Sequence, residues 1–305
     1  MIPLITIEGA TASGKSALAL KLALELGAQI ISADSRQIYR YLDIGTAKPS
    51  KQELALIPHH LIDIIDPDQS YNAGFFCRDA GRIISDLHQQ GIPAIACGGT
   101  GFYVRSLLWG LFEIPEIPLS IREALKQRLE MEGQERIYHE LELIDASFAD
   151  RISPSDTQRV LRGLEVFQGT GKTISTHWRE QENMAKYRCF RILVDPPRPL
   201  LYERINARMD TMVANGLIGE ISSLFEMGFD TLSPGLNSLG YKEYMPYFAG
   251  LEDLPTCTLI AAQHCRNYAK RQATWYRKCK FDLTIGNDCI SMSHITRLIR
   301  DFIQG

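Results

Sequence analysis

The stretch that decides the fold is Leu4-Ile5-Thr6-Ile7-Glu8, followed by Gly9-Ala10-Thr11-Ala12-Ser13-Gly14-Lys15-Ser16. The first five residues form an apolar, β-rich run, and a helix-forming run, Ala17 to Ala23, follows the second segment directly. The eight residues 9–16 match the pattern G-x-x-x-x-G-K-[ST], in the strand–loop–helix context that this motif requires. The pattern therefore predicts a phosphate-binding loop over residues 9–16, called the phosphate loop below.

Each part of the phosphate loop suits a polyphosphate. Glycines let successive backbone N–H groups turn toward an anion, and the following helix adds unpaired N–H groups and its positive dipole end. Lys15 supplies a point charge, and the hydroxyl of Ser16 suits Mg²⁺ as a metal ligand. The residues expected to bind a diphosphate group are Gly9, Ala10, Thr11, Ala12, Ser13, Gly14, Lys15 and Ser16. The loop leaves open which molecule carries the phosphates.

The composition is that of an ordinary globular protein. The chain has 305 residues, of which 23% are charged and 45% hydrophobic, and its net charge is −3. This length accommodates one large domain or two unequal ones. No apolar run approaches the length of a membrane span. The net charge argues against a globally basic nucleic-acid binder but permits local basic patches.

Cysteines and histidines do not form a metal-binding pattern. The seven cysteines are scattered and contain no C-x-x-C pair, which favours a reduced, cytoplasmic protein without structural zinc. The adjacent His59 and His60 lack a second ligand pair at helical spacing. We therefore interpret them as hydrogen-bonding residues.

Polar residues follow two further predicted strands. Residues 28–33 read as a buried strand that ends in Asp34-Ser35-Arg36-Gln37, and residues 92–97 as another that ends in Gly98-Gly99-Thr100-Gly101. Open α/β sheets bind ligands at the carboxyl ends of their strands, so both segments are expected to line the crevice of the phosphate loop. The alternative for Asp34 is a role as a helix cap.

The order of elements predicts an α/β fold with an insertion. A β-α-β-β-α-β-α pattern, with a short third strand over 59–67 and a helix over 73–91, implies a P-loop NTPase-like parallel sheet with helices on both faces. Residues 115–185 begin with a proline-punctuated linker and then look entirely helical. We therefore expect a core domain of 1–114 and 186–305 and an all-helical insertion domain of 115–185, which would act as a lid or clamp.

Basic residues concentrate in a predicted helix over 255–280. No acidic residue lies between Arg266 and Lys280, and aromatic residues are interleaved. Such a surface suits phosphate contacts and base stacking, although a solvated basic face is the alternative. Arg204 and Arg208, four residues apart, share a helical face, for which solvent exposure is again the alternative.

Together these motifs resemble the tRNA dimethylallyltransferase (tRNA isopentenyltransferase) family, along nearly the whole chain. Two positions of the loop depart from the family pattern, which usually has Pro where this chain has Ala10 and Thr where it has Ser16. Ser16 keeps the metal-binding hydroxyl, and Ala10 does not obstruct the backbone of the loop. The zinc finger of many eukaryotic members is absent, so the chain resembles bacterial members. The segments that carry the resemblance are residues 9–16, 34–39, 98–103, 156–159, 204–208, 240–243 and 271–277.

The resemblance implies transfer of the dimethylallyl group of dimethylallyl diphosphate to N6 of the adenosine 3′ of the anticodon, with release of pyrophosphate. Asp34 would be the catalytic base for the weakly nucleophilic amino group. Lys15, the loop amides, Mg²⁺ on Ser16 and an arginine would stabilise the leaving group, with Arg208 favoured over Arg204. Thr11 would face the reacting groups.

The resemblance also implies that the target base flips out of the anticodon loop. The partner would be the anticodon stem-loop, gripped in part by the insertion domain, and we expect a monomer without membrane contact. The residues implied for tRNA binding are Asp34, Ser35, Arg36, Gln37, Thr100, Arg122, Gln158, Arg159, Val160, Leu161, Arg162, Lys242, Arg271 and Arg277.

Three other functions compete with this one. An ATP-dependent small-molecule kinase explains the phosphate loop and the insertion, but not the basic helix or the cluster 34–37. Prenyl transfer to a free adenine nucleotide, as in a related hormone-synthesising family, leaves the long basic region without a polyanionic acceptor. A non-enzymatic nucleotide-binding RNA module leaves Asp34 without a role.

Overall fold

The computed structural model describes residues 1–111, 115, 117–180, 185–286 and 290–305. The chain divides into two compact units, one formed by Met1–Trp109 with Ala185–Gly305 and the other by Gly110–Met184. The second unit interrupts the first close to the positions expected for the insertion, 115 and 185. We refer to them as the core unit and the insertion unit.

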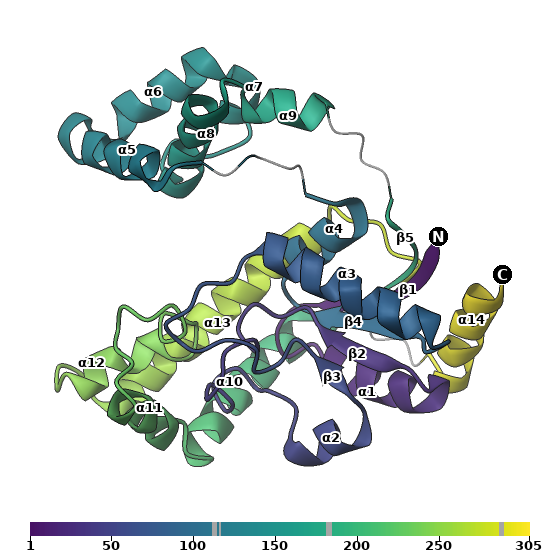
Figure 1. Ribbon diagram of the computed structural model, residues 1–305. Coiled ribbons are helices and arrows are strands. Elements are labelled where there is room, and N and C mark those ends of the chain that lie inside the picture. Colours follow the sequence, from purple (N-terminus) through teal and green to yellow (C-terminus); the bar gives the residue numbers. More distant parts are fainter. Residues whose placement is uncertain (112–114, 116, 181–184, 287–289) are drawn as a thin grey trace. The chain divides into compact units, whose positions relative to one another are not determined.

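A six-stranded sheet with the order β3-β2-β4-β1-β5-β6 forms the centre of the core unit (Figure 1). Every strand pair is parallel. The third strand is shorter than the expected 59–67, and the sixth strand was not expected from the sequence. The strands are β1 (Ile2–Gly9), β2 (Gln29–Ser32), β3 (His59–His60), β4 (Ala94–Gly98), β5 (Tyr187–Val194) and β6 (Leu283–Ile285).

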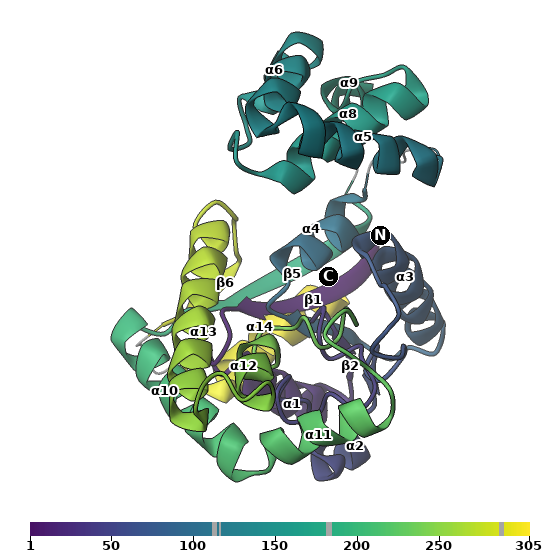
Figure 2. The same ribbon diagram turned by 90° about the vertical axis from the view of Figure 1, so that its left-hand side faces the viewer.

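Helices cover both faces of the sheet, which confirms the predicted fold class (Figures 1 and 2). Helices α1 (Lys15–Leu26) and α14 (Met292–Gln304) pack together on one face. Helices α3 (Ala73–Gln89) and α4 (Gly101–Trp109) pack together on the other. Because side chains alternate along a strand, Ile5 and Ile7 of β1 join the hydrophobic core under α1.

The remaining elements of the core unit flank the carboxyl ends of the strands. Helix α10 packs along α13, as Figure 2 shows, and α13 also contacts η1. Helix α13 ends at Tyr276, before the expected 280, because the chain turns so that Leu283 can pair with Ile192 of β5. These elements are α2 (Lys51–Leu56), α10 (Arg198–Ala214), α11 (Leu217–Glu226), η1 (Lys242–Tyr244), α12 (Met245–Phe248) and α13 (Leu254–Tyr276).

The described residues of the insertion unit form helices and the turns that join them. Leu125, Ile137, Leu141, Val160 and Leu164 form its buried core. Its helices are α5 (Leu119–Glu132), α6 (Gln134–Ile144), α7 (Ala146–Ala149), α8 (Thr157–Thr170) and α9 (Ile174–Glu180). In neither unit does a described helix combine the length and apolarity needed to cross a bilayer.

Candidate active site

The phosphate loop joins β1 to α1 through a backbone that depends on small residues. A Cβ at Gly9 would lie 2.6 Å from the carbonyl oxygen of Val194, so only glycine allows the strands to approach there. Gly14 has a φ of 98° and Ala12 a φ of 61°, both in the left-handed region. An alanine in that region costs on the order of 1 kcal/mol, a strain typical of functional loops.

Helix α1 begins with free backbone donors. Its N-cap residue Gly14 makes no side-chain cap hydrogen bond, and its first turn has no acidic residue. By contrast, the side chains of Asn72, Asp156 and Asp253 cap α3, α8 and α13. The uncapped N–H groups of α1 therefore remain available to an anion.

Lys15 adds a positive charge at the same place. Its Nζ donates a hydrogen bond to the carbonyl oxygen of Ala10 at 3.2 Å. Burial lowers the pKa of Lys15, while the nearby Asp34 carboxylate opposes that shift and Arg208 adds to it. A diphosphate would neutralise this partly desolvated cation.

Close backbone approach brings the second and fourth strand ends together, as the sequence predicted. The N–H of Ala33 donates to the carbonyl oxygen of Cys97 at 2.8 Å. A Cβ at Gly98 would lie 2.0 Å from the carbonyl oxygen of Ala33, so this crossing requires glycine. Beyond it, the N–H of Ser35 donates to Oγ1 of Thr100 at 3.1 Å.

Asp34 is half-buried in this crevice. Its Oδ1 accepts a hydrogen bond from the N–H of Arg36 at 2.9 Å, which stabilises the turn that follows β2. Residues 35–38 form a turn and not a helix, so the alternative of a helix cap is wrong. No residue that the structure describes donates a hydrogen bond to Oδ2. One carboxylate oxygen thus fixes the side chain, and the other can accept a proton.

A cavity of about 350 Å³ brings the predicted groups together. Thr11, Lys15 and Ser16 line it from the phosphate loop, and Asp34 to Gln37 line it from the end of β2. Helices α10 and α13 supply an apolar part of its wall, formed by Ile205, Met209, Met212 and Cys265. The cavity therefore offers an anion site, a carboxylate and an apolar surface side by side.

The two arginines of α10 differ in their surroundings. Arg208 is half-buried, lines the cavity, and has a pKa that burial lowers and the Asp34 carboxylate partly restores. Arg204 is exposed, although its Nη1 donates to the carbonyl oxygen of Ser13 at 3.3 Å. A purely solvated role is therefore wrong for Arg208, and this residue is the better candidate for contact with a leaving group.

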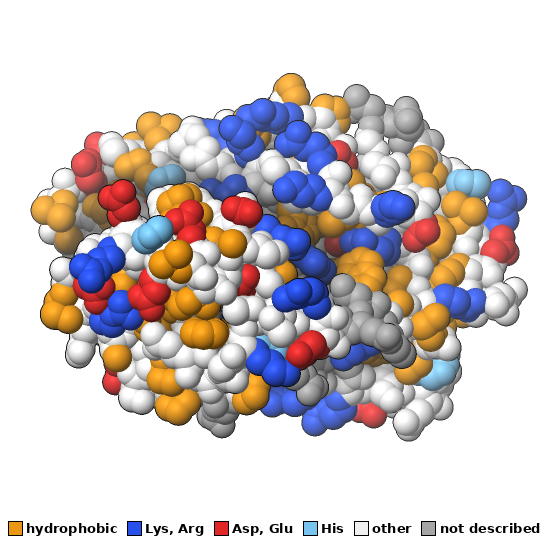
Figure 3. All heavy atoms as spheres, turned by 90° about the horizontal axis from the view of Figure 1, so that it is seen from above, with side chains coloured by type: hydrophobic (Ala, Val, Ile, Leu, Met, Phe, Trp, Pro, Cys, Tyr) orange, Lys and Arg blue, Asp and Glu red, His pale blue; other side chains and the backbone are white. Residues whose placement is uncertain are grey.

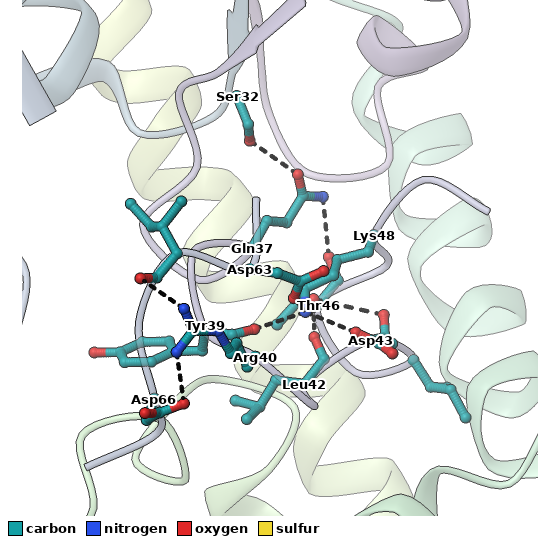
Figure 4. A network of polar contacts seen from close by, with 12 residues as sticks. Ser32, Gln37, Tyr39, Arg40, Leu42, Asp43, Thr46, Lys48, Asp63 and Asp66 are labelled. Atoms are coloured by element: carbon teal, nitrogen blue, oxygen red, sulfur yellow. Dashed lines mark hydrogen bonds and ion pairs between the residues drawn. The ribbon is translucent and has the colours of Figure 1, made fainter. Parts of the chain in front are cut away.

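Gln37 is held by the protein itself (Figure 4). Its Oε1 accepts from Oγ of Ser32 at 3.0 Å, and its Nε2 donates to the carbonyl oxygen of Ala47 at 3.0 Å. In this arrangement the side chain fixes the loop over residues 37–48. Its contact with tRNA stays a prediction.

Lys48 is the buried centre of the same loop. Its side chain is 4% exposed, and its Nζ donates to the carbonyl oxygen of Tyr39 and to Oδ1 of Asp43, both at 2.6 Å. It also pairs with Asp63, as Figure 4 shows. Because a buried charge is stable only when it is paired, this network fixes the conformation of the loop.

The substitution Lys48→Met is expected to lower the free energy of unfolding by about 2 kcal/mol, because the partners Asp43 and Asp63 are partly solvated and lose only part of their stabilisation. Urea denaturation measures this change. The matched control is Lys51→Met, which removes an exposed charge at the start of α2. Equal midpoints for the two variants would contradict the structural role of Lys48.

Basic residues of the core unit extend outward from the cavity. Arg271 and Lys242 are exposed and line it, and the guanidinium of Arg271 lies 5.6 Å from the ring centre of Tyr268. Arg277 is exposed beyond the end of α13 and does not belong to the cavity lining. Arg36 is also exposed at the cavity. In the space-filling view of Figure 3, Lys and Arg side chains form several clusters.

The residues of the insertion unit that were predicted to contact tRNA differ in how exposed their side chains are. Val160 is 0% exposed and belongs to the hydrophobic core, so its side chain packs inside the unit and we remove it from the residues that can contact RNA. Leu161 is half-buried and packs on the same core. The side chains of Arg122, Gln158, Arg159 and Arg162 are exposed.

The adjacent histidines have hydrogen-bonding roles, as the sequence predicted. Nδ1 of His59 lies 2.8 Å from the carbonyl oxygen of Ile57, and Nε2 of His60 lies 2.7 Å from Oε1 of Gln29. Within the described residues, no three His, Cys, Asp or Glu side chains are grouped so that they could hold a metal ion.

Sequence reasoning missed two residues that shape the site. The carboxylate of Glu220 accepts from the N–H groups of Asp43 and Ile44 at 2.9 and 2.8 Å and from the Tyr241 hydroxyl at 2.6 Å, which anchors the loop over residues 37–48. Gln272 of α13 contacts both glycine-containing loops. Glu220 belongs to no local pattern. Gln272 lies in the segment 271–277 that carries the resemblance, but the sequence gives it no role because its contacts join distant parts of the chain.

Two protein-family models match this chain. A family model described as IPP transferase matches residues 37–279, and a model described as isopentenyl transferase matches residues 2–64. The chain belongs to the IPP transferase family. The tRNA dimethylallyltransferase of Geobacter sulfurreducens is 41% identical over 90% of this chain and 89% of its own length. That of Roseiflexus castenholzii is 39% identical over 94% of each chain.

Solved structures agree with the family assignment. The tRNA delta(2)-isopentenylpyrophosphate transferase of Staphylococcus epidermidis is 34% identical with a TM-score of 0.71, over 100% of this chain and 99% of that one. A eukaryotic dimethylallyltransferase acting on tRNA is 27% identical with a TM-score of 0.87, over 100% of this chain and 80% of that one. The IPP transferase fold therefore extends over the whole of this chain.

Proposed function

We propose that this chain transfers the dimethylallyl group from dimethylallyl diphosphate to N6 of the adenosine 3′ of the anticodon in tRNA, releasing pyrophosphate. Membership of the IPP transferase family and the names of its relatives support this activity. The observation that supports it best is the placement of Asp34 in the same cavity as Lys15 and Arg208. One cavity thus contains both a candidate base and a site for the departing pyrophosphate.

Asp34 activates the acceptor. The lone pair of an adenine amino group is delocalised into the ring, so the group is a poor nucleophile. As the N6–carbon bond forms, Oδ2 of Asp34 takes the proton, while the hydrogen bond from Arg36 to Oδ1 keeps the carboxylate in place. A positioned base of this kind contributes typically about 10²–10⁴-fold to the rate.

Lys15 and Arg208 stabilise the leaving group. The bond between the allylic carbon and the diphosphate oxygen breaks, and both electrons leave with pyrophosphate. Lys15, Arg208 and the uncapped N–H groups of α1 are present before the reaction, so they stabilise this charge without reorganisation. Thr11 lines the same cavity and would face the reacting groups.

Mg²⁺ fits this site through Ser16. The hydroxyl of Ser16 is exposed and lines both the main cavity and a second cavity of about 320 Å³. Ser16 and the diphosphate oxygens would hold the ion. When bound, Mg²⁺ would neutralise part of the diphosphate charge.

A polyanionic acceptor accounts for the basic surface. Lys242 and Arg271 at the cavity and Arg277 beyond α13 would contact an anticodon stem-loop, whose target base would flip into the cavity beside Ser35. A free adenine nucleotide would not need this surface. The exposed cations of the insertion unit would contact the same tRNA, and the chain would act as a cytoplasmic monomer.

One experiment tests this function. Purified protein, Mg²⁺ and unmodified tRNA are combined with dimethylallyl diphosphate in one reaction and with ATP in another. Nucleoside mass spectrometry of the digested tRNA then detects N6-prenyladenosine. We expect the product only in the first reaction. No product there, together with ATP consumption in the second, would favour the kinase alternative.

The basic helix gives a prediction about salt dependence. Changing both Arg271 and Arg277 to Gln is expected to weaken tRNA binding and to reduce the slope of log K against log salt by roughly 0.7–0.9 for each phosphate that is no longer neutralised. Filter binding at several salt concentrations measures the slope. The control changes Lys21 and Arg297, exposed cations of α1 and α14, to Gln. Equal slopes for the two double variants would contradict the assignment.

A further inference from the structure

Gln272 joins three parts of the active site through one side chain. It lies on α13 and is 6% exposed. Its Oε1 accepts a hydrogen bond from the N–H of Thr11 at 2.9 Å, and its Nε2 donates to the carbonyl oxygen of Gly99 at 2.7 Å. Both ends of the amide are thus used, one on the phosphate loop and one on the loop after β4.

These contacts lie beside the diphosphate site. A Cβ at Gly99 would be 2.5 Å from Nε2 of Gln272 and 3.5 Å from Nζ of Lys15, so the amide and the Lys15 ammonium both lie beside Gly99. Because Oε1 accepts the Thr11 N–H, that donor is turned toward α13. The N–H of Ser13 donates to the carbonyl oxygen of Ala10 at 3.2 Å, so the N–H groups at the start of α1 are left for the anion.

The same helix face contacts the second loop again. A Cβ at Gly101 would lie 2.2 Å from Nε1 of Trp275, three residues after Gln272. Residues three apart lie on one face of a helix, so Gln272 and Trp275 together fix α13 against both loops. The helix therefore cannot move relative to the phosphate loop without breaking these contacts.

The adjacent part of α13 carries residues that line the cavity and would contact tRNA. Tyr268 and Arg271 line the cavity, and Tyr268 precedes Gln272 by one helical turn. A ligand that contacts Tyr268 and Arg271 consequently restricts the helix that holds the phosphate loop.

We infer that Gln272 is a positioning residue, which fixes the phosphate loop against α13 so that tRNA and diphosphate each favour binding of the other. This inference rests on the proposed function for the identity of the two ligands. The polar part of the link consists of two hydrogen bonds on a buried amide, beside the hydrophobic cluster that Ala10 and Ala269 share, so removing them loosens the loop from the helix. Gln272 also lines the cavity, but both ends of its amide are already used by these two bonds.

The test compares Gln272→Met with Gln263→Met, an exposed glutamine on the same helix. Calorimetry with Mg²⁺ and pyrophosphate gives the Kd of pyrophosphate, with and without saturating unmodified tRNA. In the unaltered chain and in Gln263→Met, we expect tRNA to lower this Kd by at least about fivefold, the lower end of usual coupling between sites. In Gln272→Met, the Kd without tRNA should rise about tenfold, as for one missing hydrogen bond, and the effect of tRNA should disappear.

Two results would overturn the inference. One is a Kd of pyrophosphate in Gln272→Met equal to that of Gln263→Met, even if the melting temperature falls, because a purely structural role predicts that pattern. The other is tRNA binding without any effect on pyrophosphate in the unaltered chain. Should Gln272→Met not fold, Gln272→Glu replaces it, since a carboxylate accepts from Thr11 but cannot donate to Gly99.

The proposed function fails in a distinguishable way. If the unaltered chain binds no tRNA or forms no prenylated product, that function is rejected. The Kd of pyrophosphate without tRNA still decides whether Gln272 positions the phosphate loop.

Discussion

Replacing Asp34 by Asn is expected to lower kcat for prenyl transfer by about 10²–10⁴-fold while leaving the affinity for tRNA nearly unchanged. An asparagine oxygen still accepts the hydrogen bond that the N–H of Arg36 donates to Oδ1, so the loop keeps its geometry. The amide cannot take the proton of the adenine amino group. Single-turnover measurement of N6-prenyladenosine gives the rate, and gel shift gives the tRNA affinity.

The pair Asp34→Asn and Asp34→Ala separates the two roles of this residue. If Asp34 only capped its loop, Asn would retain turnover, and Ala would lose it together with stability. If Asp34 is the base, both variants lose turnover to a similar extent. The control Asp86→Asn removes an exposed carboxylate of α3 outside the cavity and should leave the rate unchanged. Normal turnover of Asp34→Asn would reject the base assignment.

Local patterns in the sequence predicted the central part of the core unit correctly. The phosphate loop follows β1 and precedes α1, and the polar segments at Asp34 and Thr100 meet beside it. These features could be predicted because each depends on neighbouring residues and because parallel strands place their carboxyl ends at one edge of the sheet.

The extent of the short edge strands could not be predicted in the same way. The third strand was expected over 59–67 and is shorter, and the sixth was not expected. β3 and β6 contain two and three residues, and each exists because a neighbouring strand supplies its hydrogen bonds. The expected helix over 255–280 was too long for a related reason. The pairing of β6 with β5 requires the chain to leave the helix after Tyr276, and no local signal marks that position.

The sequence also did not predict the orientation of side chains or the contacts between distant parts of the chain. The resemblance placed Val160 among RNA contacts because it lies in a family motif, but its position on α8 points it into the core. Gln272 contacts Thr11 across 261 positions of sequence, so its role appears only when the fold brings them together. The roles of Val160 and Gln272 therefore depend on where each residue lies in the folded protein.

Replacing Lys15 by Met is expected to lower kcat by about 10²–10³-fold, as for the loss of one group that stabilises developing charge on an oxyanion. The affinity for dimethylallyl diphosphate should fall as well, because Lys15 is a cation at the end of the phosphate loop. Single-turnover rates over a range of dimethylallyl diphosphate concentrations separate the two effects. The control Lys21→Met removes an exposed cation from the same helix and should change neither.

The lowered pKa of Lys15 predicts that Lys15→Met, although it lowers activity, raises the stability of the chain without ligand. Burial lowers that pKa below the ordinary 10.5, so the unfolded chain holds the proton more tightly than the folded one. Without ligand, stability should therefore rise as pH increases from the lowered pKa toward 10.5, and Lys15→Met should raise the melting temperature at neutral pH. Pyrophosphate raises the pKa again, so it should stabilise the unaltered chain strongly and Lys15→Met weakly. Thermal melts with and without Mg²⁺ and pyrophosphate measure both effects, and a variant that is less stable without ligand would show that the ammonium holds the fold together through its bond to Ala10.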